Sequence, residues 1–155
     1  MSDYFATIKW QRKPEEVYTD RKYSRAHQWQ FDGGAVVPAS PSPHVVPAPM
    51  SNSTGVDPEE AFVASLSSCH MLFFLELAAI KKFVIDEYVD EAVGVMGKNS
   101  EGKIAMLSVT LRPKAIFSGA NLPTAEQVEQ LHHQAHEQCF IANSVKTKVE
   151  VHHRI

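Results

Sequence analysis

The apolar positions in the middle of the chain predict one long helix. From Phe62 to Ile80 they recur at spacings of three and four residues, which is the period of an α-helix. Asp57, Pro58 and Glu60 form a helix start, with a capping residue, a first-turn proline and the acidic partner of a capping box. The apolar stripe of this helix is formed by Phe62, Leu66, Cys69, Phe73, Leu77 and Ile80. We therefore expect a central, buried helix.

Strands are predicted on both sides of this helix, where apolar and polar residues alternate. The strands are expected at residues 6–10, 27–31, 89–95, 107–111 and 145–151. Residues 99–102 have the composition of a hairpin turn, and residues 35–56 contain five prolines and are expected to form a loop. A second helix is predicted from Thr124, with Gln127 as its capping-box partner, to near Cys139. This order predicts an α+β fold with a mainly antiparallel sheet, as one domain over residues 1–155.

Composition and charge narrow the function classes. The 155 residues are 44% hydrophobic and 21% charged, which suits one globular domain, and a net charge of −3 gives no basic surface for nucleic acid or anionic lipid. Residues 1–5 lack the basic and apolar segments of a signal peptide. The apolar stretch from Met71 to Ile80 contains Glu76 and is too short to span a bilayer. We expect a cytoplasmic protein that binds neither nucleic acid nor membrane.

The two cysteines are the strongest chemical signal. Two thiols cannot form the disulfide framework of a small secreted domain, so Cys69 and Cys139 point to thiol chemistry. A reactive cysteine must be a thiolate, which needs a nearby cation. The helix of Cys69 supplies no such cation within reach, and His70 points about 100° away around the helix. The alternative is that Cys69 is a small buried apolar residue.

The histidines raise a metal-binding alternative. His132, His136 and Cys139 follow one another at spacings of four and three residues, so they share one face of the second helix. No other cluster in the sequence supplies further ligands, because His152 and His153 point to opposite sides of a strand. We therefore expect surface histidines on an amphipathic helix and no metal site.

Three motifs carry a resemblance to a known family. They are Asp57-Pro58-Glu59-Glu60 ahead of the first cysteine, Ser67-Ser68-Cys69-His70 around it, and Ala135-His136 leading into Cys139. In this order and separation the chain resembles the osmotically inducible protein C and organic hydroperoxide resistance (OsmC/Ohr) family along nearly its whole length. The resemblance implies the OsmC-like fold, with mainly antiparallel sheets around a buried central helix, and an intertwined homodimer with sites at the interface.

The resemblance also implies an enzyme, a thiol-dependent peroxidase of the oxidative stress response. Cys69 would be the peroxidatic cysteine that reduces organic hydroperoxides, with hydrogen peroxide as a further substrate, and Cys139 would be the resolving cysteine. An external dithiol, a lipoyl group in some members, would reduce the resulting disulfide. No metal or bound organic cofactor is implied. The chain departs from the organic hydroperoxide resistance branch in having His70 after the first cysteine and no proline-containing turn after the second.

Family members place an arginine and a glutamate at the reactive thiolate. By motif these are Arg25, with Arg21 as the alternative, and Glu59. Ten residues of helix separate Glu59 from Cys69, a rise of about 15 Å, so Glu59 either comes from a partner subunit or only caps the helix. The alternative function is a non-enzymatic protein that binds a small ligand on the same dimeric fold.

Overall fold

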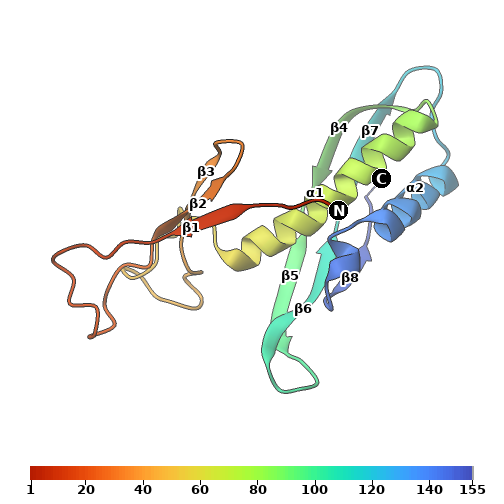
Figure 1. The fold of residues 1–155 in the computed structure, drawn as a ribbon. Helices are drawn as coiled ribbons and strands as arrows, with labels where there is room; N and C mark the ends of the chain where they lie inside the picture. The colour runs from red at the N-terminus through yellow and green to blue at the C-terminus, as the bar shows by residue number, and fades with distance from the viewer. Residues whose placement is uncertain (155) are drawn as a thin grey trace. The chain divides into compact units, whose positions relative to one another are not determined.

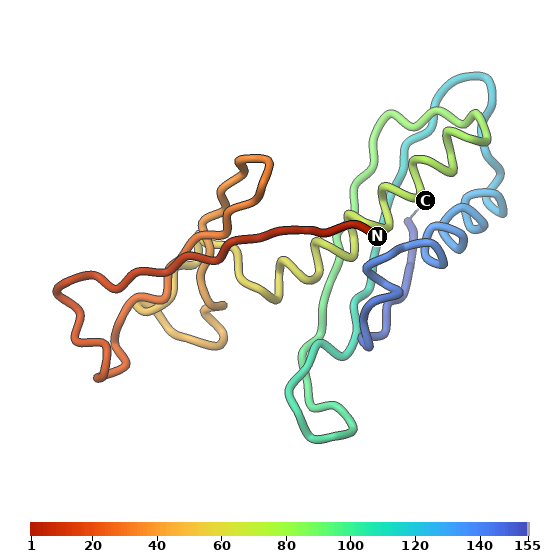
Figure 2. The backbone as a smooth tube through the Cα atoms, in the orientation of Figure 1, coloured from red at the N-terminus to blue at the C-terminus, as the bar shows by residue number. Residues whose placement is uncertain are grey.

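The computed structural model describes residues 1–154 and consists of two compact units, residues 1–61 and residues 62 onward. Figure 1 labels the elements and Figure 2 traces the backbone. The α+β class and the mainly antiparallel pairing are confirmed. The assignment of residues 1–155 to one domain stays a prediction.

The first unit contains a three-stranded antiparallel sheet. Its strands are β1 (Ala6–Lys9), β2 (His27–Phe31) and β3 (Val36–Ala39), paired in the order β1-β2-β3. The expectation of a loop throughout residues 35–56 is therefore wrong at its start. Pro38 lies inside β3, which is possible because β3 is the last strand of its sheet. On the side away from β2, Val56 forms an isolated bridge with Ala39, and the Val56 N–H donates to the Pro38 carbonyl at 2.9 Å.

Helix α1 (Pro58–Ile80) begins as the sequence predicts. The Glu60 backbone N–H donates to Asp57 Oδ1 at 2.7 Å, and the Asp57 N–H donates to Glu60 Oε2 at 3.3 Å, which is a reciprocal capping box. The buried face differs from the predicted stripe: it consists of Leu66, His70, Phe74 and Ala78, at a spacing of four. Ile80 is 64% exposed and Cys69 is only partly buried. The predicted stripe was misplaced because apolar residues surround most of this helix, so periodicity alone does not choose the face.

Helix α1 is longer than the apolar stretch from Met71 to Ile80 on which the expectation of no membrane span was based. All 23 residues of α1 form one helix that is long and apolar enough to cross a membrane by length and composition. Such a helix is weak evidence for a span, because the central helix of a globular core has the same composition. One face of α1 indeed belongs to the protein core, since Leu66, Phe74 and Ala78 are fully buried there.

The second unit contains two sheets. One pairs β4 (Val84–Asp90) with β7 (Pro113–Ser118), and the other has the order β5 (Val93–Lys98), β6 (Ile104–Leu111), β8 (Lys148–Val151). The pairing of β6 with β8 is parallel, and the others are antiparallel.

The single strand predicted over residues 89–95 is wrong, because that segment contributes to both sheets of the second unit. Asp90 lies at the break, where its carboxylate accepts hydrogen bonds from the Ser67 hydroxyl at 2.5 Å and the Arg112 N–H at 2.6 Å. These contacts end β4 and tie the break to α1. Strand β7 was not predicted. The predicted strand at residues 145–151 is shorter in the structure, where it forms β8.

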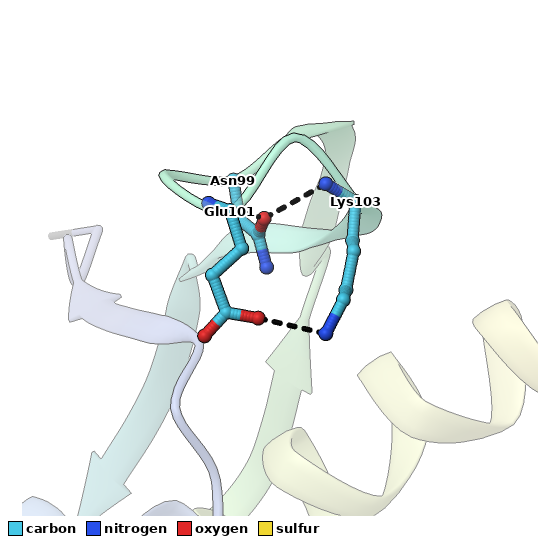
Figure 3. Close-up of polar contacts among 3 residues, drawn as sticks. All are labelled: Asn99, Glu101 and Lys103. Atoms are coloured by element: carbon cyan, nitrogen blue, oxygen red, sulfur yellow. Dashed lines mark hydrogen bonds and ion pairs between the residues drawn. The ribbon is translucent and has the colours of Figure 1, made fainter.

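The predicted hairpin turn joins β5 to β6 (Figure 3). The Asn99 side-chain oxygen accepts the backbone N–H groups of Glu101 and Lys103, both at 3.0 Å, and Lys103 Nζ lies 2.8 Å from Glu101 Oε2. Gly102 adopts φ +75°, a conformation that favours glycine. Local sequence was sufficient here because every contact lies within five residues.

Helix α2 (Ala125–Gln138) begins at the predicted cap. Thr124 and Gln127 exchange the two hydrogen bonds of a capping box, and Cys139 is the C-cap residue. A short 3-10 helix, η1 (Ala142–Ser144), follows.

The core of the second unit forms two clusters along α1. One joins the C-terminal half of α1 to α2 through Phe74, Ala78, Leu131 and Ala135, with Phe83 from the connection to β4. The other joins Leu66 to Val109 and Leu111 of β6. Along the sequence, each cysteine lies between a residue of one cluster and a residue of the other. Cys69 lies between Leu66 and Phe74, and Cys139 lies between Ala135 and Ile141.

Candidate active site

The structure brings Cys69 and Cys139 together although 70 residues separate them in sequence (139 − 69 = 70). Both are free thiols. Cys69 is partly exposed in the middle of α1, whereas Cys139 is 1% exposed at the end of α2. The packing of α2 against α1 through Leu131, Ala135 and Phe74 sets this arrangement. The two thiols therefore have different access to solvent.

The surroundings of Cys139 favour its protonated form. Burial is the largest cause, and the polar interaction with the Cys69 side chain is the second; together they raise the pKa of the Cys139 thiol to about 11. The backbone N–H of Ala142 donates to Cys139 Sγ at 3.4 Å and acts in the opposite direction. At neutral pH Cys139 is a thiol, which leaves Cys69 as the first candidate for the nucleophile.

An aromatic pair adjoins the two cysteines in sequence. Phe73 lies one helical turn after Cys69, and Phe140 directly follows Cys139. Their rings pack edge to face with centroids 5.0 Å apart. Phe140 is nevertheless 69% exposed. Sequence reasoning missed Phe140, because only the tertiary contact with α1 distinguishes it from other exposed aromatic residues.

Two histidines of the second unit are buried, and for His132 this corrects the expectation of surface histidines on the second helix. His70 is 1% exposed and His132 is 3% exposed. His70 Nε2 lies 3.0 Å from His132 Nδ1, with the two rings nearly parallel. His132 also stacks on Phe74, with centroids 4.1 Å apart, and on His153, with centroids 4.9 Å apart. The apolar surroundings of α2 on this side, rather than its sequence, bury these rings.

Burial keeps His70 and His132 uncharged. It lowers the pKa of His70 to about 4, with the neighbouring His136 as the second cause. It lowers the pKa of His132 to about 3, followed by the effects of His70 and His153. Because both imidazoles are neutral at pH 7, one nitrogen of the pair donates its hydrogen and the other accepts it.

The histidines and cysteines do not gather into a metal site. Among the described residues no group of three or more histidine, cysteine, aspartate or glutamate side chains is placed to hold a metal ion. His132, which the metal alternative included, instead uses Nδ1 for its contact with His70.

The other two predicted site residues belong to the first unit. The Arg25 guanidinium lies over the Tyr23 ring, with Cζ 4.1 Å from the centroid. It donates to the carbonyl oxygens of Tyr23 at 3.0 Å and Arg21 at 3.2 Å. Within residues 1–154 no ion pair joins it to Glu59, which lies in the first turn of α1.

This arrangement provides two thiols in one place, one accessible and one buried. A thiol that is oxidised at the accessible position has a second thiol beside it, which is the requirement for forming an intramolecular disulfide. The flanking aromatic pair makes the surroundings of the accessible thiol partly apolar.

Comparisons with known proteins agree with this fold. The family model described as OsmC-like protein matches residues 51–154. The structure of an OsmC-like protein of unknown function from Vibrio cholerae is 55% identical, with a TM-score of 0.98, over 99% of this chain and 100% of that chain.

Two more distant structures share the fold alone. An organic hydroperoxide resistance protein from Elizabethkingia anophelis is 18% identical, with a TM-score of 0.70, over 99% of this chain and 94% of that one. An organic hydroperoxide resistance protein of Bacillus subtilis is also 18% identical, with a TM-score of 0.65, over 97% of this chain and 98% of that one. A comparison with curated protein sequences found no match.

Proposed function

Because the chain belongs to the OsmC-like protein family, we propose that it is a cysteine-based peroxidase that reduces organic hydroperoxides. The family includes organic hydroperoxide resistance proteins, although the Vibrio cholerae relative has no assigned function. The observation that carries the proposal is the pairing of Cys69 with Cys139 inside the second unit, with only one of the two accessible.

The proposed cycle uses the two thiols in sequence. The Cys69 thiolate attacks the distal oxygen of the hydroperoxide, the O–O bond breaks, and Cys69 becomes a sulfenic acid. The released alkoxide takes up the proton that Cys69 gave up, and leaves as the alcohol. Cys139 then attacks the sulfenic sulfur, the S–S bond forms, and the hydroxyl leaves as water with the Cys139 proton. An external dithiol, such as a lipoyl group, reduces the disulfide by thiol–disulfide exchange.

The burial of Cys139 suits the resolving role. A thiol that is 1% exposed and has a pKa of about 11 reacts slowly with dissolved peroxide, since the thiolate is the reactive form. The same thiol adjoins Cys69, so it is available as soon as Cys69 is oxidised. Burial therefore separates the two roles without any difference in residue type.

Arg25 and Glu59 complete the proposal. Arg25 would stabilise the Cys69 thiolate, and it keeps its charge in any surroundings because a guanidinium is not deprotonated in proteins. Glu59 would hold that arginine in a bidentate pair. Since ten residues of one helix separate Glu59 from Cys69, Glu59 would serve the site of a partner subunit in a homodimer. The large exposed apolar residues Leu72 and Ile80 of α1, 61% and 64% exposed, are consistent with a covering second copy.

The test adds one equivalent of cumene hydroperoxide to the reduced protein and follows free thiols and intact mass within seconds. We expect both thiols to disappear with a mass decrease of two hydrogens. Cys69→Ser should abolish the reaction, and Cys139→Ser should replace the disulfide by sulfinic or sulfonic acid at Cys69. The matched pair separates the two roles, because each variant keeps one thiol.

If both thiols of the wild type survive in excess hydroperoxide, the enzyme assignment is refuted. The protein would then be best explained as a non-enzymatic small-ligand-binding member of the same fold. A reaction that persists in Cys69→Ser but stops in Cys139→Ser would instead reverse the two roles.

A further inference from the structure

Arg25 is held more firmly than an ordinary surface arginine. Its guanidinium carbon lies 4.1 Å from the centroid of the Tyr23 ring, the geometry of a cation–π contact. Nη1 donates to the Tyr23 carbonyl at 3.0 Å, and Nη2 donates to the Arg21 carbonyl at 3.2 Å. Both ends of the guanidinium are therefore anchored, and the ring supports its face.

The turn that supplies one of these carbonyls has an unfavourable backbone conformation. Arg21 has φ +65°, in the left-handed region that residues with a side chain rarely adopt. Its N–H donates to the Tyr18 carbonyl at 2.9 Å, and Tyr18 has φ +66°. A segment with two such residues is maintained by its surroundings, and here the result is a carbonyl placed for Arg25.

The backbone of Arg25 is fixed as well. Its N–H donates to the Met50 carbonyl at 2.9 Å. Its own carbonyl lies 2.8 Å from His27 Nδ1, and His27 Nε2 accepts the Trp29 indole N–H at 3.1 Å. Because Nε2 accepts, Nδ1 carries the hydrogen of the neutral ring and donates it to the Arg25 carbonyl.

These contacts leave most of the charged group available. A guanidinium has five N–H donors, and only two bonds from the Arg25 guanidinium to other described residues are present. An arginine that served only to stabilise the fold would gain from using more of them. The arrangement instead fixes the direction of the cation and leaves donors for an incoming group.

We infer that Tyr23 is a positioning residue for Arg25 in the thiol reaction, its ring serving as the platform that fixes the orientation of the guanidinium. The inference rests on the proposed function, in which Arg25 stabilises the Cys69 thiolate. Tyr23 acts through Arg25 and contacts no reacting atom.

The experiment measures the second-order rate of thiol loss with cumene hydroperoxide by rapid mixing, as a function of pH. Tyr23→Leu removes the platform but keeps the Tyr23 carbonyl, and Tyr23→Phe keeps the platform. Tyr18→Leu is the matched control. The Tyr18 ring packs at a tilt against Tyr23, with centroids 4.5 Å apart, and against Trp10 at 5.9 Å, so its loss disturbs the same aromatic cluster without removing the ring under Arg25. Arg25→Gln measures how far the rate falls when the cation itself is lost.

We expect Arg25→Gln to slow the reaction by about a hundredfold or more, as when a charge-stabilising donor is removed. Tyr23→Leu should slow it about two- to fivefold, the strength of an exposed cation–π contact, and move the pH profile to higher pH. Tyr23→Phe should match the wild type in rate and profile. Tyr18→Leu should fall between the wild type and Tyr23→Leu, because it removes a ring that packs on Tyr23 but keeps the ring under Arg25. Melting temperatures should fall for both leucine variants, which separates folding from positioning.

Equal rates and profiles for Tyr23→Leu and Tyr18→Leu would overturn the inference and leave the proposed function intact. An unchanged rate in Arg25→Gln would also overturn it, because there would be no catalytic cation to position. Absence of any reaction in the wild type would overturn the proposed function and this inference with it.

Discussion

The buried histidine pair makes the stability of the protein depend on pH, and His132→Gln tests this directly. In the folded state the pKa of His70 is lowered from 6.5 to about 4 and that of His132 from 6.5 to about 3, in both cases mainly by burial. The unfolded chain therefore binds more protons than the folded chain between pH 6.5 and these values. Stability should fall as the pH drops below 6.5 and level off below about pH 3 to 4.

The size of the effect follows from these values. At pH 5 an unfolded histidine of pKa 6.5 is almost fully protonated, whereas His70 and His132, with folded pKa values of about 4 and about 3, are almost fully neutral. Each therefore lowers the free energy of unfolding by about 2 kcal/mol at pH 5 relative to pH 8. Treated as independent, the two lower it by about 4 kcal/mol, a large part of the total for a domain of this size.

Urea denaturation of the reduced protein at pH 8 and pH 5 measures this difference. His132→Gln loses packing against Phe74 at both pH values, but that loss cancels when each variant is compared with itself. The acid-induced decrease should shrink by about 2 kcal/mol in His132→Gln. The neighbouring His133, 70% exposed and 3.3 Å from Glu137, is the matched control, and His133→Gln should keep the wild-type decrease.

An acid-induced decrease that is equal in wild type and His132→Gln would refute the reasoning. It would mean that His132 titrates in the folded state much as it does in the unfolded state. Titration of the imidazole C–H signals by NMR gives an independent check, since His70 and His132 should not titrate above pH 5 in the folded protein.

Two further predictions concern packing. Gly94→Ala should lower the free energy of unfolding by about 1–3 kcal/mol, because the added Cβ would lie 2.6 Å from Val63 Cγ2 and 2.7 Å from Met106 Sδ. Gly33→Ala is the control and should leave stability unchanged, because a Cβ there has nothing within 4 Å. Equal unfolding curves for the two variants would contradict the prediction. Leu72→Glu should shift the protein toward monomer in sedimentation velocity, because Leu72 is 61% exposed on α1; an unchanged, concentration-independent mass would count against a dimer that covers this face.

Local sequence determined the features whose contacts are short in range. The capping boxes at Asp57 and Thr124 and the hairpin turn at Asn99 each join residues within five positions, so the sequence pattern contains the whole interaction. The family motifs around the two cysteines likewise supported the OsmC-like assignment. The break between β4 and β5 was not predictable in this way, because it depends on Asp90 bonding to Ser67 and Arg112.

Only the tertiary structure decided which face of α1 is buried and which histidines are in the core. An almost uniformly apolar helix fits several orientations, and the packing of Leu131 and Val109 selects the one that buries His70 beside His132. Burial of Cys139 arises in the same way, from the packing of α2. It raises the pKa of the Cys139 thiol to about 11 and gives two chemically identical side chains different access to solvent. The sequence by itself determined that this chain has two thiols. Packing between residues far apart in sequence decided which thiol is buried, because burial depends on neighbours that the local sequence does not contain.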